Sequence, residues 1–218
     1  MIPNVLSIAG SDPSGGAGIQ ADVKAISANG AFAMAALTAL TAQNTQGVRD
    51  IHHVQPAFVT AQIDAVFDDI RVDAVKIGMI ANAQIAQAVA AALHGRDVPI
   101  VLDPVMIAKG GAPLLQPDAI SVLRDQLLPR ATVLTPNLPE AAHLLGVNPA
   151  TSRPEMERQG RALCALGPRA VLMKGGHSAG DICTDLLISG DNGARRIDRF
   201  EAPRVPTHNT HGTGCTYS

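Results

Sequence analysis

The chain has 218 residues and a formal net charge of −2, with 46% hydrophobic and 17% charged residues. This length is enough to bury a sizeable core, and the composition is typical of a globular protein and not of a disordered one. The balanced charge offers no basic surface to nucleic acid or to an anionic membrane, and one Tyr with four Phe gives little for stacking bases. We therefore expect neither kind of partner.

Cysteine usage and the start of the chain bear on the compartment. Cys164, Cys183 and Cys215 are odd in number and show no close pairing, which indicates reduced thiols and not a disulfide framework. The opening MIPNVLSIAG lacks the basic segment and long apolar run of a signal peptide or membrane span. We therefore expect a cytoplasmic protein.

Short apolar runs alternate with longer amphipathic runs along the whole chain. The apolar runs predict strands at Val5–Ala9, Ala36–Ala42, Ala74–Gly78, Ile100–Asp103, Thr132–Thr135, Ala170–Lys174 and Asp185–Ile188. The amphipathic runs predict helices at Ala17–Asn29, Pro56–Asp68, Asn82–Leu93, Pro117–Leu127, Leu138–Leu145 and Pro154–Leu166. Such an alternation indicates one α/β domain over residues 1–218, with a mostly parallel sheet covered on both faces.

The residues between these elements support the same boundaries. Gly30 and Gly146 stand just past two helices, where a left-handed cap residue belongs. Ser152 and Glu155 have the spacing of a capping box. The stretch Ser189–Arg196 predicts a hairpin turn leading into a strand at Arg196–Phe200, so one edge of the sheet is expected to be antiparallel.

In such a sheet, ligands bind beyond the carboxyl ends of the strands. The unusual polar stretches follow the predicted strands at that side, and in chain order they are GSDPSGGAG, TAQNT, KIGM, DPVMIAKGG, TPNLPE and KGGH. We therefore expect these loops to carry the chemistry.

The first of these loops, Gly10–Gly18, leads from a strand into a helix. Its glycines allow close backbone approach, and a helix start attracts anions. It matches neither the P-loop nor the dinucleotide fingerprint, which disfavours dinucleotide redox chemistry. The alternative is a tight turn in which Asp12 and Ser14 satisfy the backbone.

Two further polar positions also have a structural alternative. Asp22 lies in the first helix among apolar residues, where a solvated polar face is the alternative to a binding role. Gln43 ends the second strand together with Asn44. An amide there can present a donor and an acceptor to a heterocycle, or it can close the loop by a local hydrogen bond.

The stretch TPNLPE carries two compatible interpretations. Asn137 as N-cap and Glu140 three residues later form a capping box. The same pair suits the waters of Mg²⁺ and a nucleotide phosphate, because Mg²⁺ keeps water and takes few carboxylates. Asp103 at the end of the fourth strand could add charge to that metal region. Lys174 at the end of the sixth could neutralise phosphate, or be an ordinary surface lysine.

The stretch Gly212–Cys215 is the second glycine-rich loop. A Gly-x-Gly turn leaves backbone N–H groups convergent, and a helix beginning there would help to stabilise charge on a transferring phosphoryl group. Cys215 would lie in the first turn, where a thiol pKa falls, and could take a proton from an attacking hydroxyl. The alternative is a small apolar residue under a glycine turn. For His177, His208 and His211 we expect local hydrogen-bond roles and not metal ligation.

Seven stretches occur together in a fixed order: AGSDPSGGAGIQAD, TALTAQNTQGV, KIGM, VLDPVM, TPNLPEA, MKGGH and NTHGTGCT. From about Val5 to Thr216 the chain thereby resembles the hydroxymethylpyrimidine/phosphomethylpyrimidine kinases of thiamine biosynthesis, which belong to the ribokinase-like superfamily. The resemblance implies a three-layer α/β/α fold with a mostly parallel central sheet. It also implies ATP, Mg²⁺, a homodimer, and phosphorylation of 4-amino-5-hydroxymethyl-2-methylpyrimidine and then of its monophosphate.

The resemblance also implies roles for individual residues. Gln43 matches the pyrimidine-binding amide, and the further pocket walls are Asp22, Met79 and Val105 with the backbone of Gly10. Asn137, Glu140 and Lys174 match the nucleotide and Mg²⁺ side. Gly212, Thr213 and Gly214 match the anion hole, and Cys215 matches the catalytic base. A thiol, unlike a carboxylate, can stay neutral beside an acceptor that is itself a phosphate, which is our hypothesis for a cysteine here.

The chain departs from the family at its end. The family continues past GTGCT with a helix bearing small residues and further helices, so we expect a C-terminally incomplete kinase domain that exposes apolar surface. We also expect the first turn after Gly212 not to form properly, because an isolated turn is costly to nucleate. Two alternatives therefore stay open, a pyridoxal kinase and a truncated form that binds pyrimidine without turnover.

Overall fold

The computed structural model describes residues 1–106, 114–176, 180–190, 196–207 and 210–218. Their strands form one nine-stranded sheet in the order β3-β2-β1-β4-β5-β6-β7-β8-β9. The strands are β1 (Asn4–Ser11), β2 (Phe32–Asn44), β3 (Gly47–His53), β4 (Ala74–Ile77), β5 (Ile100–Leu102), β6 (Val133–Leu134), β7 (Ala170–Met173), β8 (Ile182–Ser189) and β9 (Arg196–Pro203).

The centre of the sheet is parallel and both of its edges are antiparallel. β2, β1, β4, β5, β6 and β7 pair in parallel, whereas β3 pairs antiparallel with β2, and β8 pairs antiparallel with β7 and β9. The predicted mostly parallel sheet and its antiparallel edge are thus confirmed. The predicted hairpin turn falls largely on residues 191–195, which lie outside the described residues.

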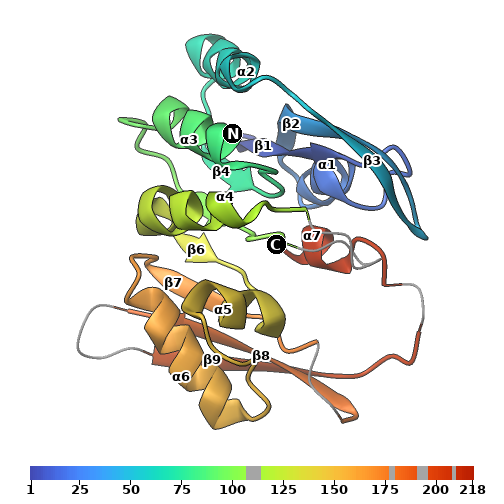
Figure 1. Ribbon diagram of the computed structural model, residues 1–218, viewed down its shortest axis with the longest axis vertical. Coiled ribbons are helices and arrows are strands. Elements are labelled where there is room, and N and C mark those ends of the chain that lie inside the picture. Colours follow the sequence, from blue (N-terminus) through green and yellow to red (C-terminus); the bar gives the residue numbers. More distant parts are fainter. Residues whose placement is uncertain (107–113, 177–179, 191–195, 208–209) are drawn as a thin grey trace.

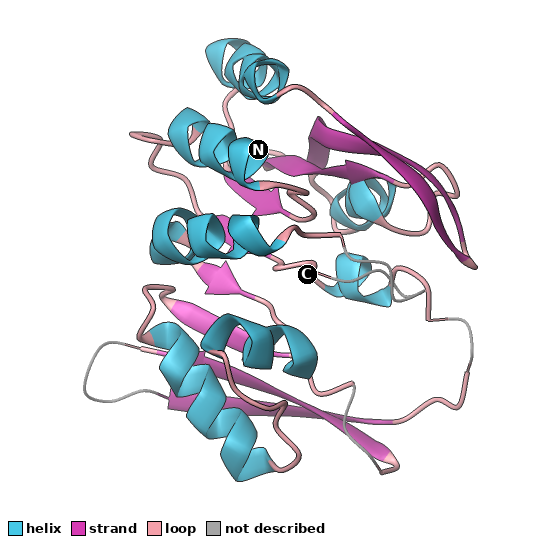
Figure 2. Cartoon of the chain, in the orientation of Figure 1, coloured by secondary structure: helices cyan, strands magenta, loops and turns pink. Residues whose placement is uncertain are grey.

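The helices flank this sheet. They are α1 (Gly18–Ala28), α2 (Pro56–Asp69), α3 (Ala83–Ala92), α4 (Pro117–Val122), α5 (Leu138–Leu145), α6 (Arg153–Cys164) and α7 (Thr213–Tyr217), with a π-helical turn η1 (Leu123–Leu127) and a 3-10 turn η2 (Leu128–Arg130) after α4. Helices α2 to α6 follow one another in a row along the sheet. Helices α1 and α7 lie outside this row and contact each other (Figures 1 and 2). Among the described residues, no helix is long and apolar enough to cross a membrane.

The alternation of side chains along β1 and β4 explains how α1 is placed. Ser7 and Lys76 are register partners, and both bond to Asp22 of α1, so they point to the face that α1 covers. Their neighbours Ile8 and Ile77 point to the opposite face, and both are fully buried in the apolar core. The sheet therefore carries an aliphatic core on one face and polar groups under α1 on the other.

Several predicted helix ends are confirmed. Gly146 caps α5 at φ 67°, and Gly30 follows α1 at φ 81°, both left-handed. Asn137 and Glu140 form the predicted capping box. The predicted box at Ser152 is only half formed. The Ser152 side chain makes no cap bond, whereas Glu155 accepts from the N–H of Ser152 as well as from the N–H and hydroxyl of Thr151.

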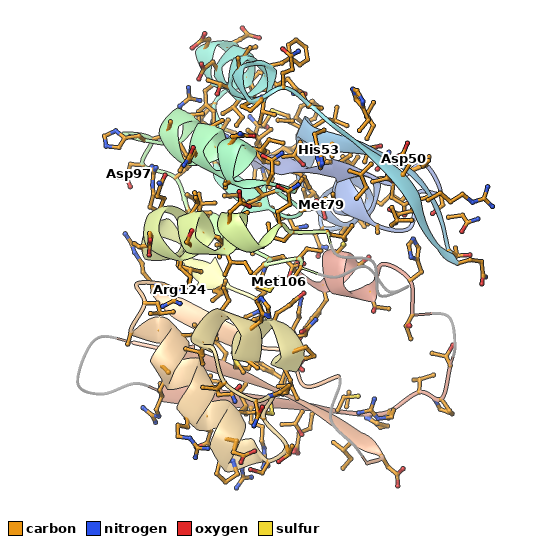
Figure 3. The ribbon with its side chains drawn as sticks, viewed as in Figure 1. Asp50, His53, Met79, Asp97, Met106 and Arg124 are labelled. Atoms are coloured by element: carbon orange, nitrogen blue, oxygen red, sulfur yellow. The ribbon has the colours of Figure 1, made fainter. Side chains whose placement is uncertain are left out.

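Two predictions about elements are corrected by the structure. No strand was expected at β3, yet it pairs with β2 as an exposed ribbon whose Asp50 and His53 are labelled in Figure 3. The helical turn after Gly212 does form. Gly212 takes φ 74° at the N-cap of α7, and the N–H groups of Thr216 and Ser218 donate to the carbonyls of Gly212 and Gly214. Contact with α1 supports this turn, so it is not isolated as the prediction assumed.

Candidate active site

The predicted loops enclose a cavity of about 640 Å³ at the carboxyl ends of the parallel strands. Its lining includes most of the predicted site residues, namely Gln43, Asp103, Val105, Asn137, Glu140, Lys174, Gly212, Thr213, Gly214 and Cys215. Gly10, Asp22 and Met79 are not among the lining residues. The structure therefore brings the proposed nucleotide, anion and base groups together, and places three predicted pocket residues behind the lining.

Lys174 and Asp103 form a buried ion pair on one wall of the cavity. The Lys174 Nζ lies 2.8 Å from Asp103 Oδ1, and the hydroxyl of Thr135 donates to the same oxygen at 3.2 Å. A side chain at Gly214 would meet Lys174 Nζ at 3.8 Å, so the ammonium group lies beside the glycine loop. The lysine is 9% exposed, which rules out the alternative of an ordinary surface lysine.

Glu140 of α5 lies on the same wall of the cavity as this ion pair. Its carboxylate accepts from the N–H of Asn137 at 2.9 Å, and the side chain of Asn137 accepts from the N–H of Glu140 at 2.8 Å. Burial raises the pKa of Glu140 to about 7, and repulsion from Asp103 adds to the rise, while Lys174 and the N–H groups of Asn137 and Met106 oppose it. This wall therefore carries two carboxylates and one ammonium group.

Cys215 is partly buried and lines the cavity. Burial raises the pKa of its thiol, as do the carboxylates of Asp103 and Asp22, and these effects outweigh Lys76 and a hydrogen bond from the N–H of Gly18. The predicted fall of the thiol pKa is therefore wrong. The helix start that was expected to lower it is weaker than desolvation and two nearby negative charges.

A second buried ion pair lies under α1. Lys76 Nζ is 2.7 Å from Asp22 Oδ1, and the hydroxyl of Ser7 donates to Asp22 Oδ2 at 2.6 Å. Burial acts to lower the pKa of Lys76, but Asp22, Asp103 and Cys215 raise it above the ordinary value. Asp22 is 3% exposed, so it belongs neither to a solvated helix face nor to the cavity lining.

The remaining predicted substrate residues are Gln43, Gly10 and Met79. The Gln43 side chain accepts from the hydroxyl of Thr41 at 3.1 Å, so the amide is oriented at the end of β2. A side chain at Gly10 would meet Met79 Sδ at 3.0 Å, so these two residues pack together. Met79 and Met106 are both buried in the middle of the molecule (Figure 3). Asn44 closes the β2–β3 turn by accepting from two backbone N–H groups.

The loop after β1 is a tight turn organised by Asp12. Its carboxylate accepts from the N–H groups of Ser14 and Ala17 at 2.9 and 2.8 Å, and from the Ser14 hydroxyl at 2.7 Å. His211 Nε2 lies 2.7 Å from Asp12 Oδ2, which matches the local role expected for this histidine. His177 and His208 lie outside the described residues.

Several residues of the site were not predicted from the sequence. The lining also contains Ala17, Leu114, Gly176, Cys183, Asp185, Thr210, His211 and Tyr217. Asp185 accepts from the N–H of Gly175 at 2.7 Å and thereby fixes the loop that follows Lys174. Asp185 lies within β8 and not at its end, so the strand-end pattern that marks Asp103 could not have identified it. Lys76, inside KIGM, had no such signal.

A mostly parallel sheet with helices on both faces, and a lysine, two carboxylates and a glycine loop at its carboxyl edge, defines a ribokinase-like kinase. A pyridoxal kinase of Bacillus subtilis in an ADP complex has this fold, with a TM-score of 0.87 and 33% identity over 100% of this chain and 81% of that one. A family model described as phosphomethylpyrimidine kinase matches residues 12–218. The chain belongs to this phosphotransferase family.

Individual relatives agree with this assignment. The chain is 52% identical to the hydroxymethylpyrimidine/phosphomethylpyrimidine kinase of Escherichia coli over 216 residues, which cover 99% of this chain and 80% of that protein. A thiamine biosynthesis bifunctional protein of Geobacter sulfurreducens is 50% identical over 99% of this chain and 43% of its own length. The crystal structure of a phosphomethylpyrimidine kinase from Clostridium difficile gives a TM-score of 0.81 at 42% identity, over 89% of this chain and 83% of that one.

Proposed function

We propose that the protein transfers the γ-phosphate of ATP to 4-amino-5-hydroxymethyl-2-methylpyrimidine and then phosphorylates the resulting monophosphate to the diphosphate. The observation that carries this proposal is that Gln43, Lys174, Cys215 and the glycine loop Gly212–Gly214 line one and the same cavity. An acceptor held by Gln43 would therefore lie within reach of both a base and an anion hole.

The residues divide the reaction between them. Gln43 presents an amide donor and acceptor to the heterocycle. Cys215 takes the proton of the hydroxymethyl group as its oxygen bonds to the γ-phosphorus and the bond from that phosphorus to the bridging oxygen of ADP breaks. The N–H groups of Gly212, Thr213 and Gly214 stabilise the charge on the transferring oxygens. Lys174 neutralises the phosphates, and Asn137 orients Glu140.

The site also suits Mg²⁺. Among the described residues, no cluster of three or more acidic, histidine or cysteine side chains could hold a metal alone. Mg²⁺ instead takes one or two carboxylates with waters and substrate phosphates. Glu140 and Asp103 supply such a pair, and the pKa of Glu140 is raised first by burial and then by repulsion from Asp103, which Lys174 opposes. When bound, the ion would neutralise charge on the phosphates of ATP.

The pocket for the pyrimidine ring involves residues in the cavity lining and residues behind it. We propose that Gly10, Met79 and Val105 shape the pocket of the heterocycle. Val105 lines the cavity directly, and Gly10 packs on Met79 beside Ala39 of β2. Asp22 would contribute through its ion pair with Lys76, which also acts on the thiol of Cys215.

The experiment that tests the proposal is mass-spectrometric detection of both phosphorylated pyrimidines after incubation with Mg²⁺ and ATP. A version extended by a family-like C-terminal segment should be assayed beside the chain. Both products are expected from the extended version. Binding of the pyrimidine by calorimetry without any product from either version would favour the non-catalytic alternative.

A pyridoxal kinase is the second candidate, because several structures similar to this chain carry that name. The pyridoxal kinase of Staphylococcus aureus bound to pyridoxal has a TM-score of 0.88 at 31% identity, over 100% of this chain and 77% of that one. The higher identity to the pyrimidine kinases favours the pyrimidine. In a competition assay with both heterocycles, preferential phosphorylation of pyridoxal would overturn our choice of substrate.

A homodimer in the cytoplasm completes the proposal. The odd number of cysteines supports a reducing compartment. Light scattering behind size exclusion tests the dimer, since a mass near 22.5 kDa, that of one chain, would contradict it.

A further inference from the structure

Thr38 carries a buried hydroxyl to which neither the fold nor the proposed chemistry gives a role. It lies in β2 among alanines and leucines, and none of its surface is exposed to solvent. Its Oγ1 donates a hydrogen bond of 2.6 Å to the carbonyl oxygen of Met79, which is 41 residues away in the chain. A valine has the same shape and suits an apolar strand better, so this bond is the physical reason for a hydroxyl at the position.

A bulge in the sheet makes the contact between Thr38 and Met79 possible. β1 lies between β2 and β4, and its register with β2 shifts at Gly10. Two residues of β2, Thr38 and Ala39, stand there opposite one residue of β1, which is the pattern of a β-bulge. A bulge re-aims side chains relative to the regular ladder. The Thr38 hydroxyl thereby reaches across the end of β1 to Met79, which follows β4.

The segment that follows Met79 is strained. Ala81 has φ 74°, and it is the one non-glycine with a positive φ among the described residues. The N–H of Asn82 donates to the carbonyl of Ile80 at 3.1 Å, so Ala81 is the centre of a γ-turn of the rare, strained kind. Such a conformation persists only where the surrounding structure fixes it. The Thr38 bond therefore holds a segment that would otherwise relax.

Met79 is linked to the proposed base through two glycines. A side chain at Gly10 would meet Met79 Sδ at 3.0 Å, and a side chain at Gly18 would lie 2.3 Å from the carbonyl oxygen of Gly10. The N–H of Gly18 in turn bonds to the thiol of Cys215. The position of the Met79 side chain is therefore passed by direct packing to the group that takes the proton in the proposed reaction.

We propose that Thr38 is a positioning residue that sets the size of the pyrimidine pocket, because its hydrogen bond fixes the Met79 thioether against Gly10. This inference rests on the proposed function, in which Gly10, Met79 and Val105 shape the pocket. A methionine side chain is flexible and fills irregular gaps, so it forms a defined wall only where its backbone is held.

The consequence of a fixed wall is selectivity between heterocycles. Pyridoxal carries one ring substituent more than the pyrimidine and therefore needs more space. A wall held by Thr38 favours the smaller ring, and a wall that is free to move loses this preference.

The test is Thr38→Val, which removes the hydroxyl and keeps the shape of the side chain. We expect KM for the pyrimidine to rise about tenfold with kcat nearly unchanged, since the lost bond orients a pocket wall and not a reacting group. KM for ATP should stay the same. The preference for the pyrimidine over pyridoxal, measured as the ratio of their kcat/KM values, should fall by about tenfold. Thr38→Ser keeps the hydroxyl and should restore the ratio.

Thr132→Val is the matched control. The Thr132 hydroxyl accepts from the N–H of Ile100 at 3.1 Å, where β5 and β6 begin, and neither residue lines the cavity. This variant should lose stability and keep the ratio. Thermal unfolding checks that each variant folds. If Thr38→Val does not fold, Thr38→Cys supplies the ratio, because a thiol is a weaker donor than a hydroxyl.

An unchanged ratio in a folded Thr38 variant, or equal losses for both heterocycles, would overturn the inference and leave Thr38 as a purely structural contact. Calorimetric affinities for both heterocycles, measured without ATP, separate this outcome from a failure of the proposed function. Product from the wild-type protein with an unchanged ratio in Thr38→Val rejects only the role of Thr38. If the wild-type protein phosphorylates neither heterocycle, the proposed function fails, and the ratio of calorimetric affinities decides the role of Thr38.

Discussion

Cys215 is the proposed base, so its ionisation controls the proton transfer. The ammonium group of Lys76 and the carboxylates of Asp103 and Asp22 act on its pKa. Because burial and the carboxylates raise its pKa, only a small fraction is thiolate near pH 7. We expect kcat/KM for the hydroxymethyl acceptor to rise by about tenfold per pH unit over the whole range from pH 7 to pH 9, because the raised thiol pKa lies above the ordinary value. Initial rates between pH 7 and pH 9 measure this.

The variant Cys215→Asp provides the control for that profile. Its carboxylate is ionised across the range, so the alkaline rise should disappear. The second transfer should fall more than the first, because a fixed charge repels the phosphate of the acceptor. A wild-type profile that is flat from pH 7 to pH 9 would count against Cys215 as the base, and an Asp variant that loses only the first transfer would end our explanation for a cysteine.

The ion pair of Lys76 and Asp22 gives a prediction about stability. Lys76→Met leaves the Asp22 carboxylate buried without its cation, which should lower the free energy of unfolding by about 3–5 kcal/mol. Urea unfolding measures this, with the exposed Lys24→Met as control. Because the pKa of Lys76 is raised, its contribution is present below 10.5 and is lost as the pH rises through the higher folded value. Equal midpoints for both variants would contradict the prediction.

The sequence identified those site residues that stand at strand ends or in glycine loops. Gln43, Asp103 and Lys174 each end a strand, and the parallel topology alone brings such ends together. Lys76, and the place of His211 in the cavity lining, were not predicted for a physical reason. Their partners lie 54 and 199 residues away, and no local spacing encodes a contact at such a separation.

At the scale of elements, the two glycine loops, Gly10–Gly18 and Gly212–Cys215, pack closely against each other. This close packing gives a prediction for Gly212→Ala. A side chain at Gly212, at φ 74°, would lie 1.6 Å from the carbonyl oxygen of Gly16, so the loops must separate. We expect a loss of phosphoryl transfer greater than a hundredfold, because the anion hole shifts. Gly30→Ala is the matched control. It has φ 81° with open space around it, and should cost about 1 kcal/mol while keeping activity.

Steady-state rates and melting temperatures of the Gly212→Ala and Gly30→Ala variants test this prediction. Comparable activity in the two variants would mean that packing between the glycine loops does not position the anion hole.

The elements themselves were predicted where the apolar pattern is strong. The central strands and α1 to α6 follow from that pattern. β3 does not, because its exposed residues Arg49, Asp50, His52 and His53 interrupt any apolar run, although it pairs with β2 through a short turn. The turn of α7 was missed because its support comes from α1 and not from its own length.

At the scale of the whole molecule, the cavity is closed by residues from both ends of the chain. Asp12 bonds to His211, and the hydroxyl of Ser218 donates to Asp103 at 3.2 Å across 115 residues. A ligand in this cavity contacts segments that only the folded chain brings together, so it should stabilise the fold by mass action.

A thermal-shift experiment measures that linkage. At a hundredfold excess over its dissociation constant, Mg²⁺ with a non-hydrolysable ATP analogue should add about 2.7 kcal/mol. For a chain of this length the melting temperature should therefore rise by about 5–10 °C. Lys174→Gln should remove most of the nucleotide shift and leave the shift caused by the pyrimidine, because in our proposal Gln43, and not Lys174, holds that ligand in the shared cavity. Loss of both shifts in that variant would mean that the two subsites are not separable, and an unchanged nucleotide shift would remove Lys174 from the phosphate site.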